Sequence, residues 1–333
     1  MNVPFTHKMA AHCESGAVTV LLNHAGLNVT ESLVFGISGA IFFGYMSIPM
    51  LPFPTIILRN KPGRIRIKTP QRLGAPFRTR SFRDPLTATR ELDALLERGI
   101  PVGAQVDYFY MDYLPEYTRA HFNAHYVIVV GKEEGRYLLS DTYFPARTSL
   151  DAATFATARF ARGQFAPRGL LFWQDATPPR PDLAPAVRRG IKDAVFYMLK
   201  VPLPFFGVRG IRYFARKVQG WPKLTRDLDH LSHEVMMIAV ILEERGTGGG
   251  GFRYLYATFL QEAAQILDNP EIAAVAKEMM DNGDRWRDVS IMAARMGKRR
   301  DLGPERLLEL GEMILERADA EQVLFRRLGG LVK

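Results

Sequence analysis

The spacing of apolar residues changes from helical to strand periodicity along the first half of the chain. A helix is predicted over 14–25, where the apolar residues form one stripe, and Gly26 ends it. Thr30 is expected to cap a second helix that runs through VFGISGAIFFGYM (34–46), and a third is predicted over 87–97. Strands are predicted at TIILRN (55–60), RIRIK (64–68), VGAQVDYFYM (102–111), AHYVIVVG (124–131), RYLLSDTY (136–143) and GLLFWQ (169–174).

Nearly all of the second half has helical periodicity. The proline-rich segment DATPPRPDLAP (175–185) is predicted to be a linker. Helices are expected around 186–200, 208–219, 226–245, 252–268, 271–281, 284–297 and 304–328. We therefore predict an α+β fold, in which a domain of helix packed on antiparallel sheet (1–175) precedes an all-α helical domain (183–333).

The segment 32–58 contains no charged residue and is long enough to cross a bilayer. Its glycines and prolines would break a spanning helix repeatedly, so we interpret it as buried core and expect no integral membrane segment. The N-terminus lacks the features of a signal peptide, and a single cysteine excludes a disulfide framework. These observations favour a cytoplasmic protein.

Positive charge is concentrated in the segment 59–90, which holds ten basic residues and one acidic residue, whereas the whole chain carries +9. Such a segment is either a solvated surface or a binding site for an acidic protein, anionic lipid or nucleic acid. A second basic run, FYMLKVPLPFFGVRGIRYFARKV (196–218), interleaves aromatic and basic residues as membrane-surface helices do.

Two short patterns suggest ligand sites but lack supporting residues. GTGGGG (246–251) is followed by no Gly-Lys-Ser/Thr and preceded by no predicted strand, so it is interpreted as a helix connector and not as a phosphate-binding loop. His230, His233 and Glu234 share a helix face, but no further ligand of matching spacing is found elsewhere. We expect no metal site.

The only cysteine, Cys13, lies just before the first predicted helix. A helix N-terminus favours a thiolate, because free N–H groups and the positive end of the helix dipole lie beside it. A structural cysteine would fit better on the apolar stripe in the middle of the helix. Position alone leaves both interpretations open.

A base and its orienting partner are predicted on two later strands. If 124–131 and 136–143 form a hairpin with a three-residue loop, His125 lies opposite Asp141. The carboxylate can then fix the imidazole tautomer whose other nitrogen faces the thiol. Cys13, His125 and Asp141, in this chain order, form the predicted catalytic triad; a two-residue loop would shift the register.

Five segments resemble the family of the butirosin biosynthesis protein H, whose N-terminal domain is papain-like. They are HCESGAVTVLLNHAGLNVTESLVFGISGAIFFGYM (12–46), GIPVGAQVDYFYMDYLPEY (99–117), HYVIVVG (125–131), SDTYF (140–144) and, in the helical half, GTGGGGFRYLYATFLQEAA (246–264). The basic segment 59–90 is not matched. The resemblance implies a papain-like cysteine acyltransferase domain over 1–175 and a helical C-terminal domain.

The resemblance also implies a reaction: transfer of an acyl group from an acyl-carrier-protein thioester to an amine, in natural-product biosynthesis. Cys13 would carry the acyl group, His125 would move the protons and Asp141 would orient His125. The backbone N–H of Cys13 and the side chain of His7 are the expected oxyanion donors.

Further residues are predicted for binding. Asp107 would attract a cationic amine, and Arg64, Arg66 and Lys68 would dock the acidic carrier protein. No cofactor of the protein's own is expected, since 4′-phosphopantetheine would arrive on the carrier. The expected partners are the carrier and a small amine, with no nucleic acid; a homodimer is left open.

Two other functions are compatible with the sequence. The same triad would serve a papain-like peptidase or amidase, because only access of water or amine to the acyl-enzyme separates hydrolysis from transfer. A non-catalytic binder of anionic lipid or nucleic acid would use the basic segments and would not need Cys13.

Overall fold

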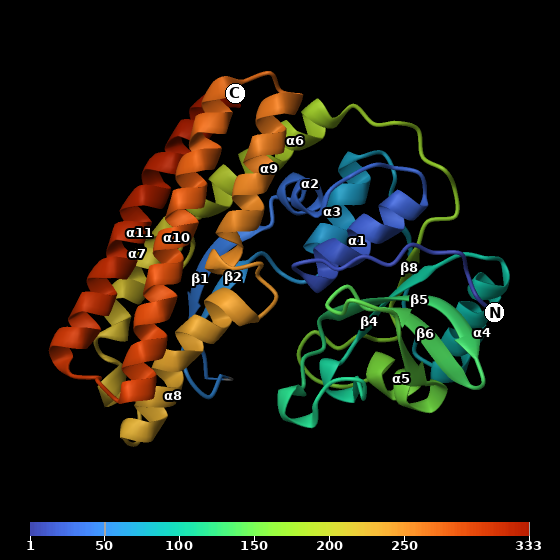
Figure 1. Cartoon of the computed structure of the whole chain (residues 1–333), viewed down its shortest axis with the longest axis horizontal. Coiled ribbons are helices and arrows are strands. Elements are labelled where there is room, and N and C mark those ends of the chain that lie inside the picture. Colours follow the sequence, from blue (N-terminus) through green and yellow to red (C-terminus); the bar gives the residue numbers. More distant parts are fainter. Residues whose placement is uncertain (50, 333) are drawn as a thin grey trace. The chain divides into compact units, whose positions relative to one another are not determined.

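The computed structural model describes residues 1–49 and 51–332, apart from the side chain of Tyr117 (Figure 1). The chain divides into two compact units. The first unit comprises Met1–Val34 and Pro62–Asp182, and the second comprises Phe35–Lys61 and Leu183–Lys333. The segment 35–61 thus belongs with the helices, whereas the sequence analysis placed it in the N-terminal domain.

The first unit is built on an antiparallel sheet with the strand order β3-β8-β4-β5-β6-β7. Its strands are β3 (Arg78–Arg80), β4 (Val102–Val106), β5 (His125–Glu133), β6 (Arg136–Ser140), β7 (Thr148–Asp151) and β8 (Leu171–Trp173). Its helices are α1 (Cys13–His24), α3 (Arg64–Arg72), α4 (Pro85–Glu97) and α5 (Ala152–Arg159), with the 3₁₀ turns η1 (Tyr108–Tyr110) and η2 (Glu116–Thr118).

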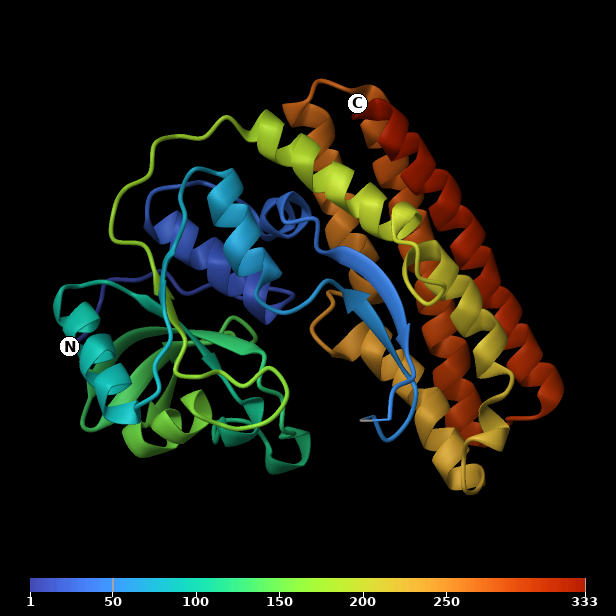
Figure 2. The same cartoon turned by 180° about the vertical axis from the view of Figure 1, so that it is seen from behind.

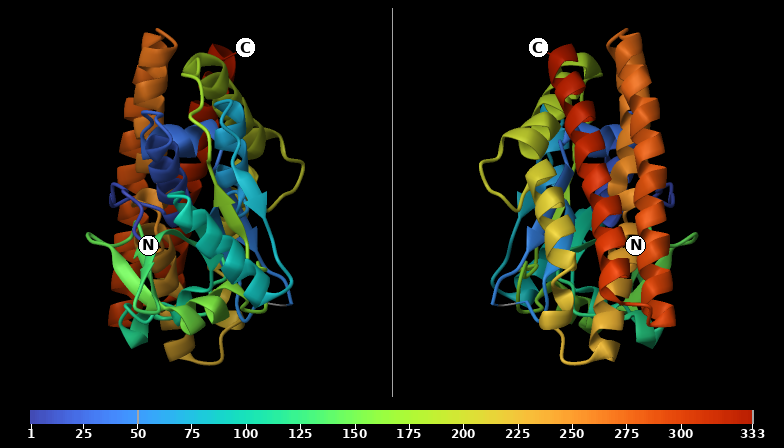
Figure 3. Two further views of the ribbon diagram at one scale, coloured as in Figure 1. Left: turned by 90° about the vertical axis from the view of Figure 1, so that its right-hand side faces the viewer. Right: turned by 90° about the vertical axis from the view of Figure 1, so that its left-hand side faces the viewer.

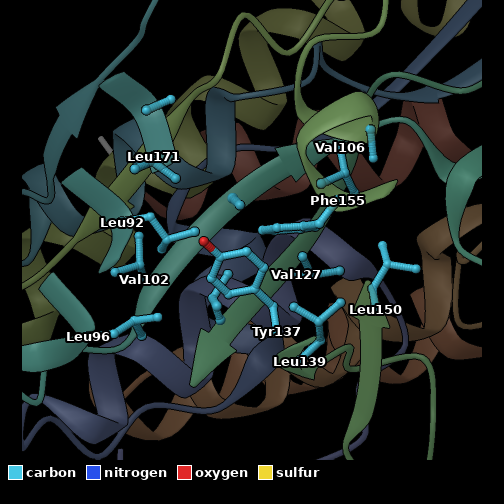
Figure 4. Packing of buried hydrophobic residues seen from close by; sticks show 14 of the residues in the cluster. Leu92, Leu96, Val102, Val106, Val127, Tyr137, Leu139, Leu150, Phe155 and Leu171 are labelled. Carbon is cyan, nitrogen blue, oxygen red and sulfur yellow. The ribbon is translucent and has the colours of Figure 1, made fainter. Parts of the chain in front are cut away.

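Both faces of this sheet are covered, and the central strand β5 shows how. Tyr126, Ile128 and Val130 pack with the apolar residues of α1 on one face. Val127 and Val129 point to the other face, where the side chains of α4 and α5 complete a second cluster (Figure 4). Because successive strand residues alternate between faces, a strand covered on both sides is apolar throughout. The predicted packing of a helix on an antiparallel sheet is confirmed.

The second unit contains long helices and one two-stranded hairpin (Figure 3). The hairpin strands are β1 (Ile41–Met46) and β2 (Thr55–Arg59). The helices are α6 (Leu183–Val195), α7 (Gly207–Val218), α8 (Leu228–Ala239), α9 (Arg253–Ile266), α10 (Pro270–Arg299) and α11 (Pro304–Leu331). Two short π-helical segments, η3 (Phe196–Lys200) and η5 (Val240–Glu244), continue α6 and α8, and two 3₁₀ turns are η4 (Trp221–Lys223) and η6 (Gly250–Phe252). The short helix α2 (Glu31–Ile37) contains the boundary between the units.

Apolar packing explains why 35–61 joins the helices. The ring of Phe43 in β1 stacks on Trp286 of α10 at 5.9 Å and lies 6.1 Å from the ring of Phe214 in α7. Tyr45 accepts a hydrogen bond from the indole of Trp221 at 3.1 Å. A two-stranded hairpin cannot bury its own apolar side chains, so these strands need a helical partner. The all-α description of the second unit therefore omits one hairpin.

Several predicted elements are wrong. RIRIK forms the start of α3 and not a strand: Gly63 precedes it with φ 86°, and Glu14 accepts the backbone N–H of Arg66 at 3.0 Å. The helix predicted through 34–46 is α2 followed by β1. The separate helices predicted at 271–281 and 284–297 form one helix, α10. In α10, Gly283 allows the ring of Tyr254 to pack on the backbone, so its small size serves packing and does not end the helix.

The hairpin register also differs from the prediction. Glu134 and Gly135 form a two-residue turn, both with positive φ, and the pairing shifts between Val129 and Gly131. Ile128 lies opposite Ser140, so Asp141 follows the end of β6 and is not paired with His125. The backbone geometry behind that prediction was therefore wrong, although the two side chains meet.

In the part of the chain that the structure describes, no helix has both the length and the apolar character needed to cross a membrane.

Candidate active site

Cys13 is the first residue of α1 and is half-buried. Its Sγ lies 3.9 Å from the carbonyl oxygen of Ala124, the residue before His125. Among the hydrogen bonds of residues 1–49 and 51–332, none engages the backbone N–H of Cys13. This N–H belongs to the free donors at a helix start, and it is available to a ligand at the sulfur.

His125 begins β5 and is buried between Asp141 and Cys13. Its Nε2 lies 2.8 Å from Oδ2 of Asp141, which leaves Nδ1 as the ring nitrogen for the thiol. Burial lowers the pKa of His125, but the carboxylate of Asp141 and a hydrogen bond with Cys13 outweigh it and raise the pKa to about 10. The imidazolium form is therefore favoured at neutral pH, with the carboxylate on one side and the sulfur on the other.

Asp141 is buried and ionised. Burial raises the pKa of its carboxyl group, but the positive charge of His125 and several hydrogen bonds outweigh this effect and lower it below the usual value. The hydroxyl of Tyr113 donates to Oδ2 at 2.9 Å, and the backbone N–H of Tyr143 donates to Oδ1 at 3.1 Å. Each carboxylate oxygen thus has a donor, which is what a buried charge requires.

Tyr113 is a residue of this site that the sequence analysis missed. Burial and the charge of Asp141 raise the pKa of its hydroxyl well above the usual value, so it stays a donor. Its ring packs edge-on against Phe144 at 5.3 Å, and Tyr108 packs edge-on against His125 at 5.2 Å. The aromatic run VDYFYMDYLPEY was the available signal, although it does not say which tyrosine reaches the carboxylate.

Glu31 was also missed, and it fixes the loop that carries Cys13. Its carboxylate accepts the backbone N–H groups of Ala11 at 2.8 Å and His12 at 2.9 Å, and the hydroxyl of Ser15 at 2.8 Å. Burial raises its pKa, and these hydrogen bonds partly offset the shift. Its place directly before the uncharged segment 32–58 is the signal that could have marked it as a buried acid.

Gly16, in the first turn of α1, lets the segment that bears Asp141 approach the helix. A Cβ at this position would lie 2.5 Å from Oγ1 of Thr142 and 2.5 Å from Cβ of Ala10. The backbone N–H of Ala10 donates to the carbonyl of Thr142 at 2.8 Å. Only glycine fits here, because both neighbours are closer than any real Cβ contact.

The oxyanion role predicted for His7 is contradicted by its hydrogen bonds. Its Nε2 lies 2.8 Å from the carbonyl of Phe144 and must donate to it, while Nδ1 lies 2.7 Å from Oγ of Ser140. Both nitrogens are occupied, so no N–H remains for an oxyanion. His7 instead ties the N-terminal segment to the residues on either side of Asp141.

Asp107 does not face a ligand either. It is 1% exposed, its Oδ1 accepts the backbone N–H groups of Phe109 and Phe122, and its Oδ2 lies 2.8 Å from Nδ1 of His121. The carboxylate therefore caps η1 and holds the loop before His125 in place. The predicted attraction of a cationic amine is wrong.

The three residues predicted to dock the carrier differ in how deeply they are buried. Arg66 is 9% exposed, donates to Thr79 at 3.1 Å and lies over the ring of Phe172, so it is an internal side chain. Arg64 and Lys68 are half-buried. Elsewhere in the basic segment, Arg78 pairs with Asp175 and Arg80 with Glu91. Inclusion of Arg66 in a docking surface is wrong.

The other two patterns lie within the second unit. GTGGGG connects η5 to α9 through η6, as predicted, and its glycines have positive φ. His230 pairs with Glu234 at 3.4 Å and packs against the ring of Phe53. No group of three or more His, Cys, Asp or Glu side chains that could hold a metal is found among the described residues.

Comparisons with known proteins place two family models along the chain. The model of the butirosin biosynthesis protein H N-terminal domain matches residues 12–142, and a domain of unknown function, DUF4872, matches residues 153–328, more than half of the 333 residues. The first match contains Cys13, His125 and Asp141.

Comparisons with curated proteins and with solved structures add little to the family assignment. Among curated proteins no match is found. The crystal structure of a protein described as a C39-like peptidase from Bacillus anthracis is 15% identical, and the alignment covers 52% of this chain and 94% of that one, with a TM-score of 0.35. A likeness this weak does not bear on the fold or the activity.

Proposed function

This chain belongs to the DUF4872 family and carries an N-terminal domain of the butirosin biosynthesis protein H type, and we propose that it is a cysteine-dependent acyltransferase. The acyl group would come from an acyl-carrier-protein thioester and would be transferred to an amine, giving an amide. The observation that carries this proposal is the position of His125: its Nε2 is hydrogen-bonded to Asp141 at 2.8 Å, and the Sγ of Cys13 lies 3.9 Å from the carbonyl oxygen of the preceding residue, Ala124.

Acylation would begin with the proton of Cys13 on His125. The sulfur attacks the thioester carbonyl, and the tetrahedral oxyanion is stabilised by the backbone N–H of Cys13 at the start of α1. The imidazolium protonates the leaving thiolate of the carrier, and acyl-Cys13 remains. Asp141, held by Tyr113, keeps His125 in the required tautomer through both steps.

Deacylation would use the same groups in reverse order. Neutral His125 removes a proton from the incoming amine as its nitrogen attacks acyl-Cys13, and then returns a proton to the sulfur. Exchange between two thioesters is nearly balanced in free energy, whereas transfer to an amine is strongly downhill. A thiol nucleophile therefore suits a thioester donor, provided that water is kept from the acyl-enzyme.

The carrier would bring its own 4′-phosphopantetheine arm and an acidic surface. Of the three bases predicted to meet it, Arg64 and Lys68 remain candidates, since both are half-exposed on α3, the helix whose N-terminus Glu14 caps. Arg66, which is buried, serves as the control residue when substitutions on this surface are compared.

Incubation with an acyl-loaded carrier and a mixture of primary amines tests the proposal. Mass spectrometry of the small-molecule products is expected to find an amide, formed by the wild type and absent with Cys13→Ala. Release of free acid alone, at the same rate with and without amines, would instead assign the site to a thioesterase or peptidase.

A further inference from the structure

Residues 183–226 of the second unit form a second concentration of positive charge. The segment holds ten basic residues and one acidic residue, Asp193, as large an excess as the segment 59–90. The basic residues are Arg188, Arg189, Lys192, Lys200, Arg209, Arg212, Arg216, Lys217, Lys223 and Arg226. The proposed acyl transfer assigns no role to this segment.

On α6 and η3 the exposed residues follow a single stripe. Arg188, Lys192, Phe196 and Lys200 recur at every fourth position and are all exposed. The opposite side of the helix is buried, from Ala186 to Met198. This spacing places an aromatic ring in line with three cations on one face.

On α7 the exposed stripe continues the pattern. Arg209 and Arg216 are exposed and Arg212 is half-exposed, at spacings of three and four residues. The ammonium of Lys217 lies over the ring of Tyr213 at 5.1 Å. Both α6 and α7 pack on α11, and Figure 2 shows them following one another along the same side of the bundle (yellow-green to yellow). The stripe of α6 and the residues Arg209 and Arg216 of α7 are exposed to solvent, whereas Arg212 reaches Asp319 of α11.

Large apolar side chains project among these charges. Phe196 is 49% exposed, Leu203 in the connection between α6 and α7 is 40% exposed, and Leu224 after α7 is 56% exposed. The connection VPLPFF (201–206) is anchored to β1, because the carbonyl of Phe205 accepts the backbone N–H of Tyr45 at 2.9 Å and Phe206 forms a bridge with Gly44. Phe196, Leu203 and Leu224 thus place apolar surface among the cations, as membrane-binding surfaces do.

Few of these charges are neutralised within the protein. Within residues 1–49 and 51–332, Arg212 pairs with Asp319 at 2.6 Å, and no ion pair is found for Arg188, Lys192, Arg209 or Arg216. The face defined by α6, η3 and α7 thus keeps an unbalanced field toward solvent.

We propose that this face, the α6–α7 face, binds an anionic lipid surface and makes the protein a peripheral membrane binder. Basic residues are attracted to the headgroups, while Phe196, Leu203 and Leu224 enter the interfacial region. A nucleic acid would use the cations, but exposed leucines would gain nothing from its phosphates. A bilayer is also an extended surface, so the stripes of α6 and α7 would contact it at the same time. This binding does not depend on the proposed acyl transfer.

The test is sedimentation of the full chain with vesicles of phosphatidylcholine alone or mixed with phosphatidylserine. The wild type is expected to bind only the anionic vesicles, and added salt weakens the binding. In Lys192→Glu/Arg216→Glu, affinity is expected to fall at least roughly 25-fold, since each positive charge near such a surface contributes roughly fivefold. Phe196→Ser/Leu203→Ser is expected to bind weakly even at low salt.

A matched variant separates this face from general charge. Arg83→Glu/Arg90→Glu changes the net charge equally at exposed positions of the first unit and is expected to retain binding. Circular dichroism checks the fold of every variant. Equal loss in both charge-reversal variants, or unchanged binding by Lys192→Glu/Arg216→Glu, would overturn the proposal. Binding of a short DNA duplex in preference to the vesicles, lost in the same variant, would assign the face to nucleic acid.

Discussion

Each of the two units buries a carboxylate beside a cation, and the surroundings of the two pairs differ. In the second unit, Glu321 accepts two hydrogen bonds from Arg253 and one each from Asn282 and Trp286, and Arg253 and Glu321 have no exposed side-chain surface. In the first unit, Asp141 accepts from His125 and Tyr113, and the contacts continue through the ring of His125 to the half-buried Cys13.

We interpret the pair in the second unit as structural and the pair in the first unit as part of the proposed active site. Every donor around Glu321 ends within the helices, so the charge is neutralised where it lies and holds α9, α10 and α11 in register. Asp141, by contrast, is hydrogen-bonded to an imidazole that can carry a proton, and the half-buried Cys13 lies on the other side of that ring. Loss of the first should cost stability, and loss of the second should cost activity.

Cys13→Ala should give the largest effect, because it removes the atom that forms the acyl-enzyme. Amide formation is expected to fall by at least roughly 10⁴-fold. The free energy of unfolding should change little, since the side chain is half-buried and small. Product assay and urea denaturation on the same preparation measure both. Activity within tenfold of wild type would exclude Cys13 as the nucleophile.

Asp141→Asn should lower kcat by roughly 10³–10⁴-fold, because the amide does not hold the imidazolium. The carboxylate raises the pKa of His125, so the alkaline limb of the pH–rate profile is expected to move to lower pH in this variant. A reduced rate with an unmoved alkaline limb would show that Asp141 acts on folding and not through His125.

The same substitution bears on stability as a function of pH. In the wild type the pKa of His125 is about 10, above the value of about 6.5 in an unfolded chain, so its contribution is complete below pH 6.5 and is lost as the pH rises toward 10. In Asp141→Asn the free energy of unfolding should fall less over this pH range. Urea denaturation at pH 6.5 and at pH 9.5, for both proteins, measures the difference.

Arg253→Met breaks the structural pair and should lower the free energy of unfolding by about 3–5 kcal/mol, since Glu321 is left as a buried charge. The double variant Arg253→Met/Glu321→Leu should recover part of this loss. The pH–rate profile of the folded enzyme should keep its wild-type shape. A shifted profile would mean that the two clusters are not separate in function.

Tyr113→Phe should have the smallest effect. Loss of one hydrogen bond to Asp141 corresponds to about 1 kcal/mol, so kcat should fall by roughly fivefold while the fold is retained. Tyr137→Phe, which removes the hydrogen bond to Asp93 at 2.7 Å, is a control of similar kind outside the site. Equal effects of the two variants on kcat would contradict a role of Tyr113 in positioning Asp141.

The residues of the proposed active site were more predictable from the sequence than the backbone that carries them. Cys13, His125 and Asp141 were chosen for their chemistry and order, and their side chains do meet, although the predicted hairpin register was wrong. The two-residue turn and the shift at Val129 could not be foreseen, because each costs little locally and is decided by packing on both faces of β5. The catalytic roles themselves stay a prediction.

Hydrogen-bond partners outside the local sequence could not be predicted from the sequence. His7 is hydrogen-bonded to residues more than 130 positions away, and Asp107 to the next loop along the chain, so the sequence did not show that these side chains are occupied. RIRIK alternates as a strand does, whereas in the structure it starts a helix that follows Gly63 and is capped by Glu14, 52 residues away. Local pattern identifies residue types that suit a reaction, while tertiary contacts decide which are free to perform it.

The most direct measurement is the intact mass of the protein after mixing with an acyl-loaded carrier and no amine. One acyl mass should be added to the wild type, located by peptide mapping to Cys13, the only cysteine, and the adduct should disappear when an amine follows. An adduct that persists in Cys13→Ala, or amide product formed with no adduct on Cys13 under quenched conditions, would contradict the account.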